Sequence, residues 1–252
     1  MPRAHAALSA LIAFAFACGR DRAPAAAAAA DSTGARSGDG PGAGAIYVSN
    51  EDSRDLTVID AATDSIVATI AVGTRPRGVH VGPDGRVFVA VSGSPKCPPT
   101  MPDAECAKLV ADRSKDGIAV VDVPGRRVER MLPGGSDPEN FAVSADGSRL
   151  FVSNEDANAA TIVDVASGKV SATIPVGREP EGVGVRPGGS EVWVTGETDH
   201  DVTIFDGATG RVTGHMVVDK RPRGVAFSPD GATAYVTAEV GGTLSIVDAS
   251  AR

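Results

Sequence analysis

The amino-acid sequence predicts an all-β fold built from repeated four-stranded antiparallel units, and three observations carry this prediction. Five similar apolar runs end in an aspartate at spacings of 62, 42, 42 and 42 residues: Asp60, Asp122, Asp164, Asp206 and Asp248. A proline step repeats with the same spacings at Pro76, Pro138, Pro180 and Pro222. Within each unit, short β-type runs alternate with turn residues. The period is therefore 42 residues, with one 20-residue insertion in the second unit.

The third full unit shows the elements most plainly. Its four runs cover residues 182–185, 191–195, 202–206 and 211–217, and the glycine-rich stretches 187–189 and 207–210 separate them. Four antiparallel strands in about 40 to 45 residues form one blade of a β-propeller. No unit has an apolar 3.6-residue period of useful length, which excludes a helical solenoid.

The strands of a unit differ in character, and this predicts their order from axis to rim. The first run is small and rich in glycine, as at Gly78, Gly182 and Gly224, which suits a crowded central channel. The second run carries bulkier side chains, which we expect to pack between neighbouring blades. These side chains are Phe88, Phe151, Trp193 and Tyr235.

The N-terminal part of the chain is predicted to be an export signal followed by a tether. Residues 1–18 hold one early cation, Arg3, then an apolar stretch that ends in small residues, which is the layout of a secretory signal. Phe16-Ala17-Cys18 resembles a bacterial lipobox, in which Cys18 is lipidated. The alternatives are ordinary signal cleavage near Ala17 and neither lipidation nor cleavage. Residues 19–44 are rich in alanine and glycine and predict a disordered tether. Residues 45–252 carry the propeller repeats.

Charge, hydropathy and cysteine usage indicate which partners the protein can have and whether it contacts a membrane. A formal net charge of −8 without a basic, aromatic-interleaved run argues against a nucleic-acid partner. Beyond the signal no apolar run reaches the roughly 18 to 20 residues that span a bilayer, so a lipid anchor is the only expected membrane contact. Cys97 and Cys106 lie nine positions apart in the insertion, at about residues 92–117. In an exported chain they predict a disulfide; metal binding is the alternative, although no histidine is near and the spacing is unlike that of zinc sites.

Strand topology divides the loops between two faces. The turns at Gly85, Gly147, Gly188 and Gly231 share one face with the strand-end aspartates, where we expect structural turn roles. The crossovers between blades lie on the other face and carry basic, acidic, acidic and basic pairs in chain order. This charged face is the predicted site, and its candidate residues are Asn50, Glu51, Asp52, Arg75, Arg77, Glu139, Glu155, Glu181 and Arg223.

Two interpretations of these charges are open. In the first, the charged side chains form a ring of ion pairs between blades, each worth roughly 0 to 1 kcal/mol where exposed. Alternatively, Arg75, Arg77 and Arg223 grip an anionic ligand or an acidic patch on a partner. Mixed signs suit protein recognition better than tight binding of a small anion, because neighbouring carboxylates repel the anion. The insertion is expected to project from the same face.

Motifs for catalysis, metals and cofactors are missing from the sequence. There is no His-x-x-His pair, haem-attachment motif, nucleophile elbow, phosphate loop or dinucleotide fingerprint, so no metal or cofactor is predicted. His80, on a channel strand, is a weak catalytic candidate. The matching positions hold Ala142, Gly184 and Ala226, so filling space is the favoured interpretation of His80.

The repeat also resembles a known family. Tyr47-Val48-Ser49-Asn50, Phe151-Val152-Ser153-Asn154 and Tyr235-Val236-Thr237, each followed by a Val-Ile-Asp-like strand, are similar to the YVTN-type β-propeller repeat from residue 45 to residue 252. A closer resemblance, to exported propellers associated with pyrroloquinoline quinone (PQQ)-dependent catabolism, rests on the segments 49–52, 74–78, 92–95, 112–117 and 153–156. It implies a periplasmic or outer-membrane-associated lipoprotein with a quinoprotein dehydrogenase or cytochrome c as partner.

The number of blades departs from that family. The repeats begin at a second-type strand and end after a third-type strand, which gives three complete blades and two partial ones. The resemblance implies seven blades, so either this is a truncated seven-bladed propeller or it closes as a ring of about five.

Three functions remain open from the sequence. The leading hypothesis is a non-enzymatic exported binding or scaffold protein, an accessory to periplasmic PQQ-dependent alcohol oxidation. A propeller lactonase-like hydrolase using His80 and Arg77 is the second, because some seven-bladed propellers are lactonases. The third is a structural or adhesive surface repeat protein.

Overall fold

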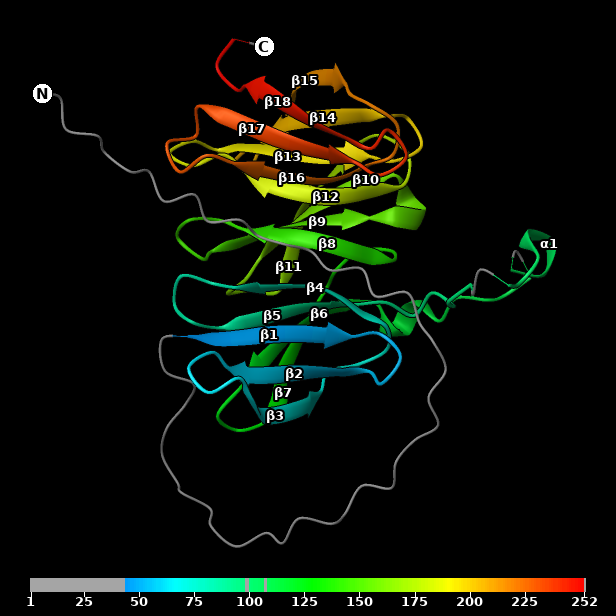
Figure 1. Cartoon of the computed structure of the whole chain (residues 1–252), viewed down its shortest axis with the longest axis vertical. Helices are drawn as coiled ribbons and strands as arrows, with labels where there is room; N and C mark the ends of the chain where they lie inside the picture. The colour runs from blue at the N-terminus through cyan, green and yellow to red at the C-terminus, as the bar shows by residue number, and fades with distance from the viewer. Residues whose placement is uncertain (1–43, 98–99, 107, 252) are drawn as a thin grey trace, which may run out of the picture. The chain divides into compact units, whose positions relative to one another are not determined.

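The computed structural model describes residues 44–97, 100–106 and 108–251. The predicted signal at 1–18, Cys18 and the predicted tether up to residue 43 lie outside the described residues. Five antiparallel sheets follow one another in chain order from β1 to β18 (Figure 1). Three of them have four strands and the first and last have three, which confirms the predicted three complete and two partial blades.

Each sheet is formed by strands that are consecutive in the chain. The first sheet holds β1 (Ala45–Asn50), β2 (Asp55–Asp60) and β3 (Ser65–Ala71). The second holds β4 (Pro76–Val81), β5 (Val87–Val91), β6 (Gly117–Asp122) and β7 (Arg127–Leu132). The third holds β8 (Pro138–Val143), β9 (Arg149–Asn154), β10 (Ala159–Asp164) and β11 (Lys169–Pro175). The fourth holds β12 (Pro180–Val185), β13 (Glu191–Gly196), β14 (Asp201–Asp206) and β15 (Val212–Val217), and the fifth holds β16 (Pro222–Phe227), β17 (Thr233–Ala238) and β18 (Thr243–Asp248).

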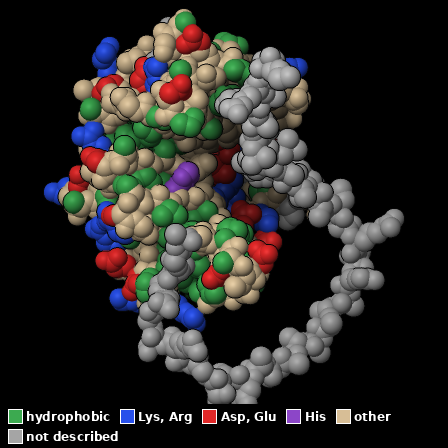
Figure 2. All heavy atoms as spheres, turned by 60° about the vertical axis from the view of Figure 1, so that its left-hand side comes forward, with side chains coloured by type: hydrophobic (Ala, Val, Ile, Leu, Met, Phe, Trp, Pro, Cys, Tyr) green, Lys and Arg blue, Asp and Glu red, His purple; other side chains and the backbone are tan. Residues whose placement is uncertain are grey.

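The core lies between the sheets, in four apolar clusters that each join two consecutive blades. Phe88, Phe151 and Trp193 of the second strands are almost fully buried in these clusters, as predicted. Tyr235 differs, with 36% of its surface exposed, because no sheet among the described residues follows β16–β18. Hydrophobic side chains gather toward the middle of the face shown in Figure 2, and charged side chains of both signs lie around them.

The first strand of each complete blade lies innermost, as predicted. β4 contacts β8, β8 contacts β12, and β12 contacts β16, so these strands pack against one another in succession. Glycine permits this close approach: a Cβ atom at Gly182 would lie 2.6 Å from the carbonyl oxygen of Arg223 and 2.8 Å from the Cα atom of Gly224.

The loops of the turn face have the structural roles that the sequence predicted. Gly85, Gly147, Gly188 and Gly231 have φ between 70° and 81°, a range that other residues seldom adopt. The strand-end aspartates accept backbone hydrogen bonds from the turns that follow. Asp206, for example, accepts from the amides of Ala208 at 3.1 Å and Thr209 at 2.8 Å.

The insertion between β5 and β6 contains one short helix, α1 (Asp103–Cys106), and a 3₁₀ turn, η1 (Arg113–Lys115). A second 3₁₀ turn, η2 (Glu155–Ala157), follows β9. Cys97 and Cys106 form the predicted disulfide, with their Cα atoms 5.7 Å apart. Within the described ranges, none of the helices has the length and apolar character needed to cross a membrane.

The close approach of inner strands gives a direct test of the fold. Gly182→Ala places a methyl group against the backbone of β16, and overpacking of this kind costs about 1 to 3 kcal/mol. We expect a lower melting temperature by calorimetry. Gly189→Ala is the matched control, since its nearest neighbour would lie 3.9 Å away, and an equal loss in both variants would contradict the proposed strand packing.

Candidate functional site at the crossover face

The crossovers between blades share one unusual backbone conformation. Arg75, Asp137, Glu179 and Arg221 each precede a proline and have φ between 41° and 59°. Left-handed residues other than glycine are uncommon and cost of order 1 to 3 kcal/mol, so the surrounding structure must hold them. Part of that support comes from backbone amides of the neighbouring loops, which donate to the carbonyls of Asp137 at 3.0 Å, Glu179 at 3.0 Å and Arg221 at 2.8 Å.

A register shift follows each of these prolines, so a bulge begins every inner strand. The bulges contain Arg77, Glu139, Glu181 and Arg223. Bulges redirect side chains and are common beside functional sites. The same sequence of left-handed residue, proline and bulge therefore recurs at one position in four successive blades. It presents a basic, an acidic, an acidic and a basic side chain in chain order.

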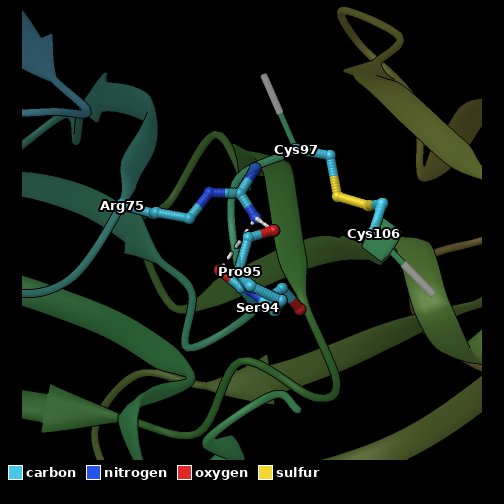
Figure 3. Close-up of a disulfide and its surroundings, with 5 residues drawn as sticks. All are labelled: Arg75, Ser94, Pro95, Cys97 and Cys106. Atoms are coloured by element: carbon cyan, nitrogen blue, oxygen red, sulfur yellow. Dashed lines mark hydrogen bonds between the residues drawn. A yellow bond between two sulfur atoms is a disulfide. The ribbon is translucent and has the colours of Figure 1, made fainter. Parts of the chain in front are cut away.

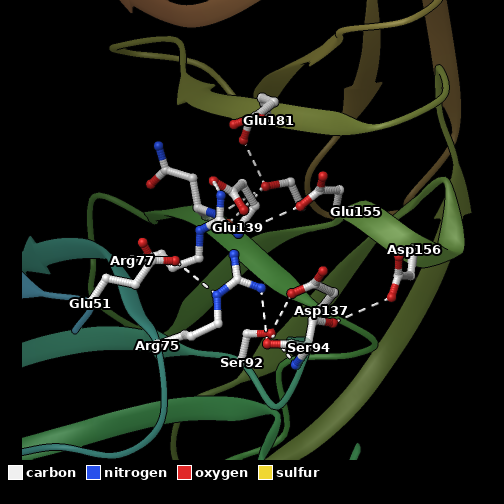
Figure 4. A network of polar contacts seen from close by, with 12 residues as sticks. Glu51, Arg75, Arg77, Ser92, Ser94, Asp137, Glu139, Glu155, Asp156 and Glu181 are labelled. Carbon is white, nitrogen blue, oxygen red and sulfur yellow. Dashed lines mark hydrogen bonds and ion pairs between the residues drawn. The ribbon is translucent and has the colours of Figure 1, made fainter. Parts of the chain in front are cut away.

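Arg77 joins the second blade to the third. It donates a hydrogen bond to Glu139 of the next crossover, and its Nη1 atom lies 3.6 Å from Glu155 (Figure 4). The side chains of Arg77 and Glu139 are 18% and 9% exposed, so this ion pair is largely shielded from water. Removal of one partner would leave a buried charge uncompensated.

Two arginines form a similar cluster between the fourth and fifth blades. Arg223 Nη1 lies 2.7 Å from Glu197, 3.2 Å from Glu181 and 3.6 Å from Glu239. Arg221 also pairs with Glu197 and lies 3.7 Å from Glu239. Among the described residues these contacts form the ion pairs between blades of the first interpretation, and the arginines that were predicted to grip an anion are engaged by carboxylates.

Carboxyl groups outnumber their basic partners in the buried part of the face, and this shifts two pKa values. Burial and the negative charge of Glu139 raise the pKa of Glu155 to about 7. Burial, followed by the charge of Glu139, raises the pKa of Glu181 to about 9. Glu139 Oε2 is buried without a hydrogen-bond donor, and a protonated Glu155 is placed to supply one. The cluster therefore retains protons near neutral pH.

The insertion is anchored beside this cluster. Arg75 donates to Glu51 Oε1 at 2.8 Å and to the carbonyls of Ser94 at 3.0 Å and Pro95 at 3.3 Å, close to the disulfide (Figure 3). Lys96 lies 2.6 Å from Asp52, which fixes the insertion to the first blade.

The insertion also reaches the third blade. Arg113 forms an ion pair with Asp156 and donates to Ser94 Oγ at 2.7 Å. Asp116 accepts from the amides of Gly93 at 2.7 Å and Asp137 at 3.1 Å, which closes the base of the insertion on the crossover. The insertion thus spans three blades at one side of the face.

These groups surround a cavity of about 670 Å³. Its basic lining residues are Arg75, Arg77, Lys96, Arg113, Arg221 and Arg223. Its acidic lining residues are Glu51, Asp137, Glu155, Asp156, Glu179, Glu181 and Glu197. Both disulfide cysteines line it as well. The cavity is therefore polar, of mixed sign and bordered by the insertion.

The structure brings most of the predicted face residues together, and separates three from the cavity wall. Glu51, Arg75, Arg77, Glu155, Glu181 and Arg223 line the cavity. Glu139 is buried and pairs with Arg77. Asn50 instead holds its own turn, donating to Asp55 at 2.7 Å and Thr57 at 2.8 Å, and Asp52 binds Lys96 outside the wall.

His80 lies on the inner strand β4 and is not among the residues that line this cavity. Its Nε2 atom lies 3.2 Å from Asn140 Oδ1, and its ring packs edge-on against Phe141. Burial lowers the pKa of His80. These contacts match the interpretation that His80 fills space, and this cavity, which Arg77 lines, does not include His80.

Sequence reasoning did not assign Lys96 and Arg113 to the site. A signal was present for Lys96, because it is adjacent to Cys97 in an insertion expected at this face. Arg113 lies in the segment 112–117 that carries the family resemblance, but its pairing with Asp156 depends on how the insertion folds back. Among the described residues, no group of three or more His, Cys, Asp or Glu side chains is arranged to hold a metal ion.

The raised pKa values predict a pH dependence of stability. Glu155 and Glu181 bind protons in the folded state at pH values where the unfolded chain has released them. The free energy of unfolding therefore falls as the pH rises through this range. The range runs from about 4.5 to about 7 for Glu155 and from about 4.5 to about 9 for Glu181. Glu155→Gln/Glu181→Gln removes this penalty. At pH 8 we expect the variant to exceed wild type by on the order of 1 kcal/mol, or about 2 to 4 °C in melting temperature.

Thermal melts of both proteins from pH 5 to pH 9 measure this difference. At pH 5 the two proteins should be nearly equal in stability, because wild type is then protonated at both sites. Parallel pH profiles for wild type and variant would show that these carboxyl groups hold no proton in the fold.

The disulfide predicts a local effect. Cys97→Ala/Cys106→Ala should release the tip of the insertion around α1 while its base and the blades stay folded, because Arg75 and the buried carboxylate of Asp116 still hold the base. Hydrogen exchange should rise at the amides of Glu105 and Leu109 and stay unchanged at Gly93 and in β9 and β10. Faster exchange in β9 and β10 as well would mean that the disulfide supports the blades rather than the insertion.

Comparisons with known proteins agree with the fold. Residues 101–187 match the family described as YNCE-like beta-propeller. The search of curated proteins found no match.

Two solved structures show the same architecture. Hydrazine synthase from Kuenenia stuttgartiensis aligns with a TM-score of 0.64 and 23% identity, over 78% of this chain and 53% of that one. A functionally unknown protein from Desulfotomaculum acetoxidans DSM 771 aligns with a TM-score of 0.62 and 17% identity, over 81% of this chain and 65% of that one. This chain therefore spans less than two thirds of either structure, and at these identities the likeness is one of fold. The chain is a β-propeller protein, similar over residues 101–187 to the YNCE-like propellers.

Proposed function

We propose that this protein is a non-enzymatic binding module that recruits a protein partner through the cavity on its crossover face. The observation that carries this proposal is the cavity itself, lined by both signs of charge and bordered by a disulfide-closed insertion. Interspersed charges give a surface that selects a partner of complementary pattern and rejects others. A partner's charged side chains would exchange with the exposed pairs at the rim.

The arginine pairing favours a protein over a small anion. Arg77 and Arg223 each contact at least two carboxylates, and Arg75 contacts Glu51. A free anion would have to displace these carboxylates and then lie among them. A protein surface can instead supply cations for the carboxylates and carboxylates for the cations.

The partner we propose is a periplasmic quinoprotein dehydrogenase or its cytochrome c, with the chain exported and anchored through a lipid on Cys18. The resemblance to PQQ-associated propellers supports this choice. All five segments that carry the resemblance contribute residues to the cavity wall or its anchoring contacts, for example Glu51, Arg75, Ser94, Arg113 and Glu155. The likeness is thus concentrated at the proposed binding face.

A capture experiment tests the partner and the face together. The immobilised chain is exposed to periplasmic extract, and bound proteins are identified by mass spectrometry. We expect a quinoprotein dehydrogenase or a c-type cytochrome to bind wild type. Binding should fall at least tenfold in Lys96→Glu/Arg113→Glu, which reverses two rim charges that are 47% and 40% exposed.

The matched control is Arg86→Glu/Arg211→Glu, which reverses two arginines of the turn face. It should bind like wild type. Equal loss in both double variants would indicate a general charge effect, and capture of neither partner by folded wild type would contradict the proposed role.

A further inference from the structure

One position of the repeat determines the charge at each junction between inner strands. It is occupied by Arg77, Glu139, Glu181 and Arg223, at spacings of 62, 42 and 42 residues. Between the second and third blades Arg77 pairs with Glu139, and between the fourth and fifth blades Glu181 lies 3.2 Å from Arg223. Between the third and fourth blades, where β8 packs on β12, both residues at this position are glutamate. At this position the middle junction therefore has two acids and no cation.

Glu139 has one carboxyl oxygen without a hydrogen-bond donor. Its Oε1 atom accepts from Arg77, whereas its Oε2 atom is buried and has no partner (Figure 4). The side chains of Glu139 and Glu181 are only 9% and 8% exposed, so water does little to solvate them. A buried acceptor without a donor costs free energy. A donor that enters this junction from outside would recover that cost.

The charged groups around the junction leave an excess of carboxyl groups. The arginines on either side are already engaged by the carboxylates of their own junctions. Burial, followed by the negative charge of Glu139, raises the pKa of both Glu155 and Glu181, so in the free protein protons take the place of a cation. The groups that face this region are Asp137, Glu139, Glu155, Glu181, Glu197 and Glu239, with Arg77, Arg221 and Arg223.

The junction is reached through the cavity on the crossover face. Glu155 and Glu181 line that cavity, whose volume of about 670 Å³ is large enough for a side chain or a small organic cation. The two neighbouring junctions show which cation suits these carboxylates, because a guanidinium group occupies both. Guanidinium is planar, is more weakly hydrated than an ammonium group and binds carboxylates through several N–H donors.

We propose that the cavity binds a guanidinium or primary ammonium group between Glu139 and Glu181, at the junction of the third and fourth blades. The bound cation donates to Glu139 Oε2, and Glu155 and Glu181 release their protons to solvent as it binds. The group comes from a small organic cation or from an arginine or lysine of a protein partner, and only the second source rests on the proposed function.

Isothermal titration calorimetry of the full chain with ethylguanidinium tests this site. Ethylurea is the matched neutral probe, because it has a similar shape and no charge. We expect ethylguanidinium to bind and ethylurea to give no measurable binding. Protons compete with the cation at low pH, so the affinity for ethylguanidinium, which stays charged throughout, should rise about tenfold from pH 6 to pH 8.

A variant locates the binding on these carboxyl groups. Glu181→Gln removes one of the two facing acids and should weaken ethylguanidinium binding by about tenfold, the value of a charge-assisted hydrogen bond. The substitution also removes a buried acid, so the variant should be at least as stable as wild type at pH 8 and its loss of affinity is not a loss of fold. Glu129→Gln, at an exposed position of the rim strand β7, is the matched control and should bind like wild type.

Three results would overturn the proposal: no preference for ethylguanidinium over ethylurea, an affinity that does not change with pH, or unchanged binding by Glu181→Gln. A capped Gly-Gly-Arg-Gly-Gly peptide, compared with its citrulline counterpart, distinguishes the two sources of the cation. Binding of the arginine peptide supports a side chain of a partner, and binding of ethylguanidinium alone supports a small organic cation. The titrations do not depend on the capture experiment, so this site and the proposed function can fail separately.

Discussion

The constraint on which the structure depends is that each of the three complete blades is apolar on both faces. All five residues of β5 are buried, as are five of the six in β9 and in β13. Such a sheet cannot stand alone in water, since each exposed large side chain forgoes roughly 1.5 to 3 kcal/mol. The three complete blades are therefore stable only with a neighbour on either side. This requirement sets the close packing of the inner strands, and it explains why glycine recurs there.

Among the described residues, the buried charged side chains lie at the end of the stack where the chain crosses between blades: Asp137, Glu139, Glu181 and Glu197. The left-handed residue, the proline and the bulge repeat with little change, whereas the side chains that they carry change sign from blade to blade. Ion pairs at this face consequently join neighbouring blades, as Arg77 does with Glu139 and Arg223 does with Glu181, in addition to pairs within one blade such as Arg223 with Glu239. Because the carboxyl groups exceed the arginines in the buried region, part of the negative charge is neutralised by protons on Glu155 and Glu181.

The period of 42 residues was sufficient to predict the sheets, their order and the inner position of the glycine-rich strands, because these features follow from local pattern. The pairing of Cys97 with Cys106 followed in the same way from spacing and context. Other features depend on the assembled geometry. Nothing in the residue type of Arg75 or Arg221 signals a left-handed backbone, and nothing local brings Arg113 to Asp156. Asn50 was assigned to the face by its loop, yet its amide lies within reach of Asp55 and Thr57 and holds the turn instead.

The insertion breaks the symmetry that the repeat would otherwise impose. In four blades a glutamate follows the second-type strand at the same position, Glu51, Glu155, Glu197 and Glu239, while the second blade begins its insertion there. A symmetric ring of charges would offer a partner several equivalent orientations. With Lys96 and Arg113 anchored to the first and third blades, one side of the cavity differs from the others, so the partner that we propose would meet a single complementary orientation. The repeated blades thus supply the rigid frame, and in the proposed function the insertion between β5 and β6 supplies the direction of binding.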